Sequence, residues 1–158
     1  MKIITVLKLL AAIAVCQMAG IIGTFFTTPA ITTWYATIVR PSIAPPNWVF
    51  APVWTTLFTL MGIAAFLVWN KGLHRKDVRI ALWIFGGQLV LNTLWSIIFF
   101  GMQNPGGALI EITVLWLAIL ASIIAFHKIS KPAAYLLIPY ILWVSFAAYL
   151  NYLFWALN

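Results

Sequence analysis

Charged residues are scarce in this chain of 158 residues. It contains 2 acidic residues and 9 lysines and arginines, which together make up 7% of the sequence. About a quarter of the residues of a soluble domain are charged. So few charges cannot cover a surface that faces water, whereas the 65% hydrophobic content suits contact with lipid. The composition predicts an integral membrane protein whose main surroundings are the lipid bilayer.

The scarcity of cysteine excludes another class of sites. Cys16 is the only cysteine, so the chain can form no internal disulfide and no cysteine-based metal cluster. We find no pair of nucleophile and base, no phosphate-binding loop and no spacing of metal ligands. The net charge of +7 could indicate a nucleic-acid partner. Its basic residues lie between apolar runs, however, so we expect no nucleic-acid partner. Because metal-ligand spacings are missing, we also expect no metal and no required cofactor.

Long apolar runs are what the sequence does have. They cover residues 3–26, 48–69, 80–100, 108–126 and 132–157. A helix that spans a membrane needs roughly 20 apolar residues. We therefore predict an all-α membrane protein, a bundle of five transmembrane helices that forms one domain over residues 1–158. The first run is long for a signal peptide and lacks a clear cleavage site, so we expect it to be retained. Pro139 is expected to kink the fifth helix.

The segment between the first two runs, residues 27–47, differs from the other connections. Proline restricts its own backbone and that of the residue before it, so this segment is predicted to be a loop. A loop this long and aromatic is typical of a functional lid. Its prolines are Pro29, Pro41, Pro45 and Pro46, and its aromatic residues are Trp34 and Tyr35.

The basic residues predict the orientation of the helices. With five crossings, eight basic residues share the side of the N-terminus, and only Arg40 lies on the other side. Basic residues concentrate on the cytoplasmic side of membrane proteins. We expect the N-terminus inside and the long first loop outside. The eight residues are Lys2, Lys8, Lys71, Arg75, Lys76, Arg79, Lys128 and Lys131.

Aromatic and amide side chains recur at helical spacing in three of the predicted helices. Residues four apart share a helix face. Such faces could line one apolar pocket with a few polar anchors. Packing between helices and anchoring at the membrane surface explain the aromatic residues as well, and hydrogen bonding between helices explains the amides. The faces are Phe50, Trp54 and Phe58; Gln88, Asn92, Trp95, Ser96 and Phe99; and Trp143, Ala147 and Asn151.

Other polar and small residues have simpler interpretations. Glu111 could reach the outer interface or bond a neighbouring helix; a proton-relay role is the alternative, but the sequence offers no chain of partners for it. Gly20 and Gly23 predict a close helix contact, within the bundle or between subunits. His74 and His127 lie in charged loops and are expected to be solvated; a role as haem ligand is the alternative, but both lie on the side away from the aromatic lid.

Several motifs resemble the TspO/MBR family, which comprises the bacterial tryptophan-rich sensory proteins and the mitochondrial translocator protein. The resemblance covers essentially the whole chain, in order. The motifs of the first loop and second helix are Trp34-Tyr35, Arg40-Pro41-Ser42, Pro45-Pro46-Asn47-Trp48-Val49-Phe50 and Pro52-Val53-Trp54. Those of the third and fifth helices are Gly87-Gln88-Leu89 with Asn92, Trp95 and Phe99-Phe100-Gly101, and Pro139-Tyr140 with Trp143, Phe146-Ala147 and Asn151-Tyr152.

The resemblance implies a homodimer with a pocket beneath the first loop. Family members bind porphyrins such as protoporphyrin IX and haem, and mitochondrial members also bind cholesterol. Tyr152 is followed here by no basic residue, so the cholesterol-recognition pattern is incomplete and we do not expect sterol binding. The ligand-binding residues that the resemblance implies are Trp34, Tyr35, Pro45, Pro46, Phe50, Trp54, Phe58, Asn92, Trp95, Phe99, Trp143 and Ala147.

We expect a receptor or sensor for porphyrins, with a role in tetrapyrrole homeostasis or the response to stress. Arg40 could pair with a propionate of the ligand or could be a solvated charge. Some bacterial relatives are reported to degrade porphyrin in light. The resemblance implies Trp54 and Trp143 as the catalytic residues of that reaction, and degradation and transport are the alternative functions.

Ile43 stands where the family often has tryptophan. Helical spans favour the inner membrane of a bacterial cell.

Overall fold

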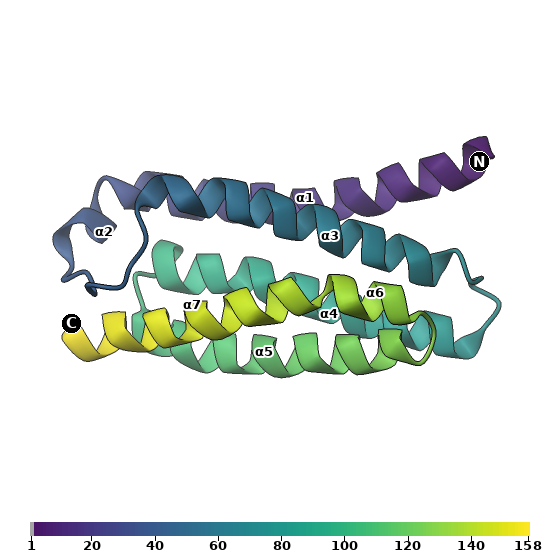
Figure 1. Ribbon diagram of the computed structural model, residues 1–158. Helices are drawn as coiled ribbons and strands as arrows, with labels where there is room; N and C mark the ends of the chain where they lie inside the picture. The colour runs from purple at the N-terminus through teal and green to yellow at the C-terminus, as the bar shows by residue number, and fades with distance from the viewer. Residues whose placement is uncertain (1) are drawn as a thin grey trace.

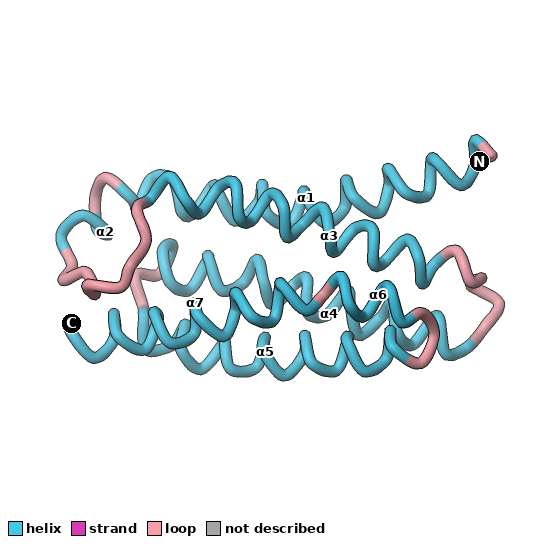
Figure 2. Tube along the Cα trace, in the orientation of Figure 1, coloured by secondary structure: helices cyan, strands magenta, loops and turns pink. Residues whose placement is uncertain are grey.

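The computed structural model describes residues 2–158, and these residues form helices joined by short connections (Figures 1 and 2). Five segments are long and apolar enough to cross a membrane, and no strand is present in the part of the chain that is described. The prediction of an all-α protein with five transmembrane helices is confirmed. The elements are α1 (Ile3–Ile31), α2 (Trp34–Thr37), η1 (Asn47–Val49) continued by α3 (Phe50–Trp69), α4 (Lys76–Ser96) continued by the π-helical turn η2 (Ile97–Gly101), α5 (Pro105–His127), α6 (Lys131–Leu136) and α7 (Ile138–Leu157).

The helices form a bundle with two distinct ends. Helix α1 packs against α3 and α4, α4 packs against α5, and α5 packs against α7. Figure 1 shows the N-terminus, the connection from α3 to α4 and the turn from α5 to α6 at one end. Helix α2 and the last residue of α7 lie at the opposite end. The predicted basic positions therefore gather at the first end, which we call the basic end.

Local sequence determines where helices begin and break. Asn104 caps α5, because its Oδ1 accepts a hydrogen bond at 3.0 Å from the backbone N–H of Gly107. Proline then occupies the first position of α5, where no N–H is needed. Pro139 leaves a backbone carbonyl of the preceding turn without its donor, and the helix is interrupted at Leu137, between α6 and α7. The sequence predicts a kink at Pro139, and the structure shows a break in the helix two residues before it, at Leu137.

The predicted start of the first loop, at residue 27, is wrong. Helix α1 continues through Pro29 and ends at Ile31. A proline in the last turn interrupts few helical hydrogen bonds, and in lipid a helix satisfies its backbone better than a loop does. The Thr33 hydroxyl donates at 2.7 Å to the Pro29 carbonyl and so bonds one of the last free acceptors. We use the term lid for residues 32–46, which connect α1 to η1 and include α2.

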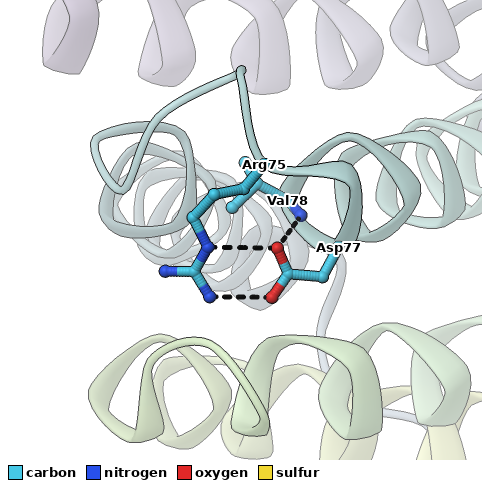
Figure 3. Close-up of polar contacts among 3 residues, drawn as sticks. All are labelled: Arg75, Asp77 and Val78. Carbon is cyan, nitrogen blue, oxygen red and sulfur yellow. Dashed lines mark hydrogen bonds and ion pairs between the residues drawn. The ribbon is translucent and has the colours of Figure 1, made fainter.

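At the basic end, one ion pair joins the start of α4 to the preceding turn (Figure 3). The Arg75 guanidinium meets the Asp77 carboxylate at 2.7 and 3.1 Å, and the same carboxylate accepts from the Val78 N–H at 2.9 Å. A carboxylate in the first turn of a helix interacts favourably with the free N–H groups there. The charged segment that the sequence places between two spans is therefore partly helical.

Glycines allow α1 and α3 to approach closely. A Cβ atom added to Gly62 would lie 2.5 Å from the Cα atom of Ile13, and one added to Gly20 would lie 2.5 Å from the ring of Phe58. Both distances are too short for real contacts. The predicted small-residue contact therefore lies within the bundle.

Candidate ligand-binding site

A cavity of about 350 Å³ lies inside the half of the bundle that the lid covers. Small-molecule sites commonly have volumes of about 300–1,000 Å³ and mostly apolar walls with a few polar groups. Four long helices contribute aromatic or aliphatic side chains, and α1 contributes a wall of small and hydroxyl side chains. The lining includes Gln17, Gly20, Thr24, Thr28 and Ile31 of α1; Phe50, Trp54 and Phe58 of α3; Asn92, Trp95 and Ser96 of α4, with Phe99 and Phe100 of η2; Ile112 and Leu115 of α5; Trp143, Ala147, Leu150 and Phe154 of α7; and Tyr35 of α2.

Aromatic rings from three different spans line the cavity. On α3, the rings of Trp54 and Phe58 lie with their centroids 5.5 Å apart. In the α4–η2 span, Trp95 stacks on Phe99 at 4.9 Å. Trp143 of α7 meets Phe50 of α3 edge to face at 6.1 Å. These contacts hold the indoles in fixed positions around one space, because offset and edge-to-face aromatic pairs are the favourable arrangements.

The lid is held down by aromatic packing at the mouth of the cavity. The Tyr35 ring lies 5.6 Å from that of Phe100 and 5.4 Å from that of Phe154. The Trp34 ring meets Phe99 edge to face at 5.6 Å. These rings belong to a second apolar cluster, separate from the main core of the bundle.

Hydrogen bonds fasten the other side of the lid. The Val39 N–H donates to Asn158 Oδ1 at 2.8 Å, and Asn158 Nδ2 donates to the Val39 carbonyl at 3.0 Å. The same Nδ2 also donates at 2.9 Å to the carbonyl of Phe154, on α7. The Asn158 amide therefore clamps the lid backbone to the end of α7.

Arg40 is the only cation of the lid. Its guanidinium lies 5.6 Å from the centroid of the Tyr35 ring and donates to the Pro45 carbonyl. Burial raises the pKa of the Tyr35 phenol above its ordinary value, and the nearby Arg40 charge offsets part of that rise. The phenol is therefore neutral at physiological pH, and the exposed guanidinium has further N–H groups available for an anion.

Two sets of buried polar groups cross the bundle beside the cavity. Tyr140 on α7 bonds to both Gln88 and Asn92 on α4, at 2.7 and 2.8 Å. The Trp95 indole N–H donates at 2.9 Å to Asn151 Oδ1, and Asn151 Nδ2 donates at 2.8 Å to a backbone carbonyl at the start of α5. Buried polar groups normally find such partners. The hydrogen-bonding interpretation of the amides therefore applies, and Asn92 also lines the cavity.

The structure brings most of the predicted site residues to this one cavity. Trp34, Pro45 and Pro46 do not line it. Trp34 packs on Phe99 behind the wall, and the Pro45 carbonyl holds Arg40. The residues that line it are Tyr35, Phe50, Trp54, Phe58, Asn92, Trp95, Phe99, Trp143 and Ala147.

The α1 wall is the part of the cavity that sequence reasoning missed. Its residues are mainly threonines, glycines and aliphatic side chains, which carry no aromatic signal. Gln17 was also overlooked; its Nε2 bonds to the Thr55 carbonyl at 3.0 Å and to the Thr59 hydroxyl at 2.9 Å. A glycine and a threonine one turn apart on α1, Gly20 and Thr24, are the signal that could have indicated this wall.

The prediction for Glu111 is wrong, because its side chain neither reaches the outer interface nor bonds a neighbouring helix. It is 7% exposed, and both carboxyl oxygens are buried without a hydrogen-bond partner. The indole N–H of Trp143 is also buried without a partner. His74 and His127 are exposed, as predicted.

Fold and cavity together define a multi-pass α-helical membrane protein with an aromatic-lined cavity under a lid. Residues 12–156 match the model of the TspO/MBR family, and the chain belongs to that family. It is 44% identical over 153 residues to the tryptophan-rich protein TspO of Chlorobaculum tepidum, with 97% of each chain covered. It is 40% identical over 139 residues to the translocator protein of Homo sapiens, covering 87% of this chain and 82% of the relative. A tryptophan-rich sensory protein of Cereibacter sphaeroides is 37% identical over 119 residues, which cover 75% of this chain and 73% of the relative.

Proposed function

We propose that this membrane protein is a receptor that binds porphyrins, such as protoporphyrin IX or haem, in the cavity beneath the lid. One observation carries the proposal: Trp54, Trp95 and Trp143, from three separate spans, line a single apolar cavity. A porphyrin is a large, flat and apolar ring, and indole faces stack favourably on such rings.

The lid supports the same ligand class. A porphyrin carries carboxylates at one edge, and these need water or a cation. Arg40 supplies a cation beside Tyr35, which lines the cavity. A guanidinium binds carboxylates through paired, charge-assisted hydrogen bonds. In the proposed complex, the ring lies among the indoles and the carboxylates lie toward the lid.

The relatives' names support a role in sensing. One relative is named a tryptophan-rich sensory protein and another a translocator protein. For this chain we propose that porphyrin occupancy reports tetrapyrrole levels, in tetrapyrrole homeostasis or the response to stress. The incomplete recognition pattern after Tyr152 makes sterol a control ligand that should not compete.

We propose that the basic end faces the cytoplasm and that the lid faces the opposite side of a bacterial inner membrane. The structure brings eight of the nine basic residues to the basic end, whereas Arg40 lies in the lid at the other. Basic residues next to spans determine orientation in this sense.

We also propose that two copies associate through the outer face of α4. Trp83 is 81% exposed and Val90 is 68% exposed. Between them, Gly86 and Gly87 have open space where a side chain would be. Small residues flanked by large ones allow close packing of helices in lipid. Cross-linking of Gly87→Cys in membranes should give a dimer, and Asn70→Cys at the basic end should not.

Light-dependent degradation of porphyrin is the second candidate function. Trp54 and Trp143 line the same cavity, so both indoles would lie beside a bound photosensitiser. Illuminating the complex in the presence of oxygen separates the two functions. A defined product formed over many turnovers supports an enzyme, whereas bleaching that consumes the protein's own tryptophans supports a receptor.

Tryptophan fluorescence titration with protoporphyrin IX tests the receptor proposal. We expect saturable quenching, weakened roughly tenfold or more in Trp54→Ala and Trp143→Ala because each loses a stacking face. Trp83→Ala is the matched control, since this indole faces away from the bundle. Equal affinity in all three variants would place the ligand elsewhere.

A further inference from the structure

Gln88, Asn92 and Tyr140 form a hydrogen-bonded chain that ends at the cavity. The Tyr140 hydroxyl donates to Gln88 Oε1 at 2.7 Å, and Asn92 Nδ2 donates to the Tyr140 oxygen at 2.8 Å. Gln88 and Tyr140 are each 1% exposed, so water cannot replace either partner. Asn92 is the member that lines the cavity.

The direction of this chain is fixed at its far end by Met61. Gln88 Nε2 lies 3.8 Å from Met61 Sδ, which is a weak acceptor and cannot donate. Rotating the Gln88 amide would turn its carbonyl oxygen toward the sulfur, where it would find no donor. The Gln88 oxygen therefore faces Tyr140 and accepts the single hydroxyl proton of Tyr140. The Tyr140 oxygen has no second proton to donate, so it can only accept from Asn92.

This direction leaves the Asn92 oxygen free for a ligand. Within residues 2–158, no group donates to Asn92 Oδ1, and this atom is not among the fully buried atoms that lack a partner. It therefore keeps accessible surface in the cavity that its side chain lines. Most of its neighbours there are aromatic or aliphatic, so the cavity offers a hydrogen-bond acceptor in apolar surroundings.

We propose that Asn92 Oδ1 selects flat apolar ligands that carry an N–H or O–H donor, and that Gln88, Tyr140 and Met61 are positioning residues that hold this oxygen toward the ligand. The inference rests on the proposed porphyrin-binding function. The inner N–H groups of a porphyrin lie in the ring plane and point to its centre, so an outside oxygen cannot accept from them in line. The donor must therefore lie on the outer edge of the ligand, as in carbazole, whose single N–H points outward. The cavity should favour carbazole over dibenzofuran, which has nearly the same shape with an oxygen in place of the N–H.

Carbazole and dibenzofuran are the matched pair of ligands, and the affinity of each is measured by its displacement of bound protoporphyrin IX. The two rings have nearly the same size and are both flat, so the pair differs mainly in the N–H group. We expect the wild-type protein to bind carbazole roughly five- to tenfold more tightly, the contribution of about one hydrogen bond. The ratio of the two dissociation constants is the readout, because a general loss of packing changes both constants together.

The variants test each member of the chain. Asn92→Leu removes the acceptor and should bring the ratio close to one. Tyr140→Phe frees the Asn92 amide to rotate and should lower the ratio, as should Met61→Leu, which keeps roughly the volume of the side chain but removes the sulfur. Met18→Leu on the lipid-facing side of α1 is the control and should leave the ratio unchanged.

The outcomes separate this inference from the function on which it rests. If the wild-type protein binds both ligands equally, the inference is overturned while porphyrin binding stands. If Asn92→Leu keeps the wild-type ratio, the acceptor is misassigned. Should Asn92→Leu fail to fold, Asn92→Ala gives the same comparison, because the Tyr140 hydroxyl can still donate to Gln88. If protoporphyrin IX binds but neither ligand displaces it, the inference is overturned and the proposed function stands. If protoporphyrin IX does not bind the wild-type protein, the proposed function falls and the inference with it.

Discussion

Replacing Asn158 with alanine should loosen the lid and speed the release of a bound ligand. The side chain makes two hydrogen bonds to the backbone of Val39, at 2.8 and 3.0 Å. Each hydrogen bond contributes about 0.5–1.5 kcal/mol net, and this exposed site favours the lower part of that range. The closed lid should lose about 1–2 kcal/mol, which corresponds to a dissociation rate roughly 5- to 30-fold faster if lid opening limits release.

Stopped-flow tryptophan fluorescence measures this rate after dilution or competition of bound protoporphyrin IX. Asn158→Asp keeps the acceptor for the Val39 N–H but loses the donor, so its rate should fall between those of the wild-type protein and the alanine variant. Asn70→Ala is the control, because Asn70 is exposed at the basic end, far from the lid. If protoporphyrin IX dissociates from the Asn158→Ala variant at the wild-type rate, the reasoning that the Asn158 clamp governs lid opening is refuted.

Three further predictions concern packing, the polar network and pH. Gly62→Ala should destabilise the bundle by roughly 1–3 kcal/mol in denaturant unfolding of the dilute monomer, because the new Cβ meets the backbone of Ile13, whereas Gly86→Ala, which meets no atom of its own chain, should be neutral there. Asn151→Leu should lose roughly 1–3 kcal/mol in the same assay, since an indole N–H and a backbone carbonyl lose their partner; unchanged stability would contradict the network. Burial raises the pKa of Tyr35. When the absorbance titration curve of Tyr35→Phe is subtracted from that of the wild-type protein, the difference should therefore have its midpoint above pH 10. The raised pKa means that the lid is fully stabilised by the neutral phenol below pH 10 and weakens as the pH rises through that midpoint; a midpoint at or below 10 would contradict its burial.

The sequence predicted the spans well because length and hydropathy decide whether a segment crosses lipid. It also predicted the faces that meet at the cavity, since residues four apart on α3, α4 and α7 share a face whatever the neighbouring helix does. Phe50, Trp54 and Phe58 illustrate this, because all three line the cavity. Periodicity placed these residues on one face, but it left pocket lining and helix packing as alternatives, and the resemblance to the family pointed to a pocket.

Contacts between helices were beyond that reasoning. Pro29 suggested a loop, but backbone hydrogen bonding in an apolar setting favours continuing α1 to its end. Gly20 suggested a close contact without saying that Phe58 would be the partner. Glu111 was expected to find water or a bond, and only the packing of α5 shows that its oxygens have neither. The Asn158 clamp joins groups 119 residues apart, a distance that no local pattern reveals.

Ring-current shifts of the indole N–H signals of the protein on addition of protoporphyrin IX test the central claim most directly. A bound porphyrin strongly shifts the NMR signals of protons near its faces, and each assigned tryptophan reports its own position. We predict large, saturable shifts for Trp54, Trp95 and Trp143, and none for Trp83 or Trp155, which are 81% and 53% exposed. Shifts confined to the two outward-facing indoles, with the three cavity indoles unchanged, would contradict the account.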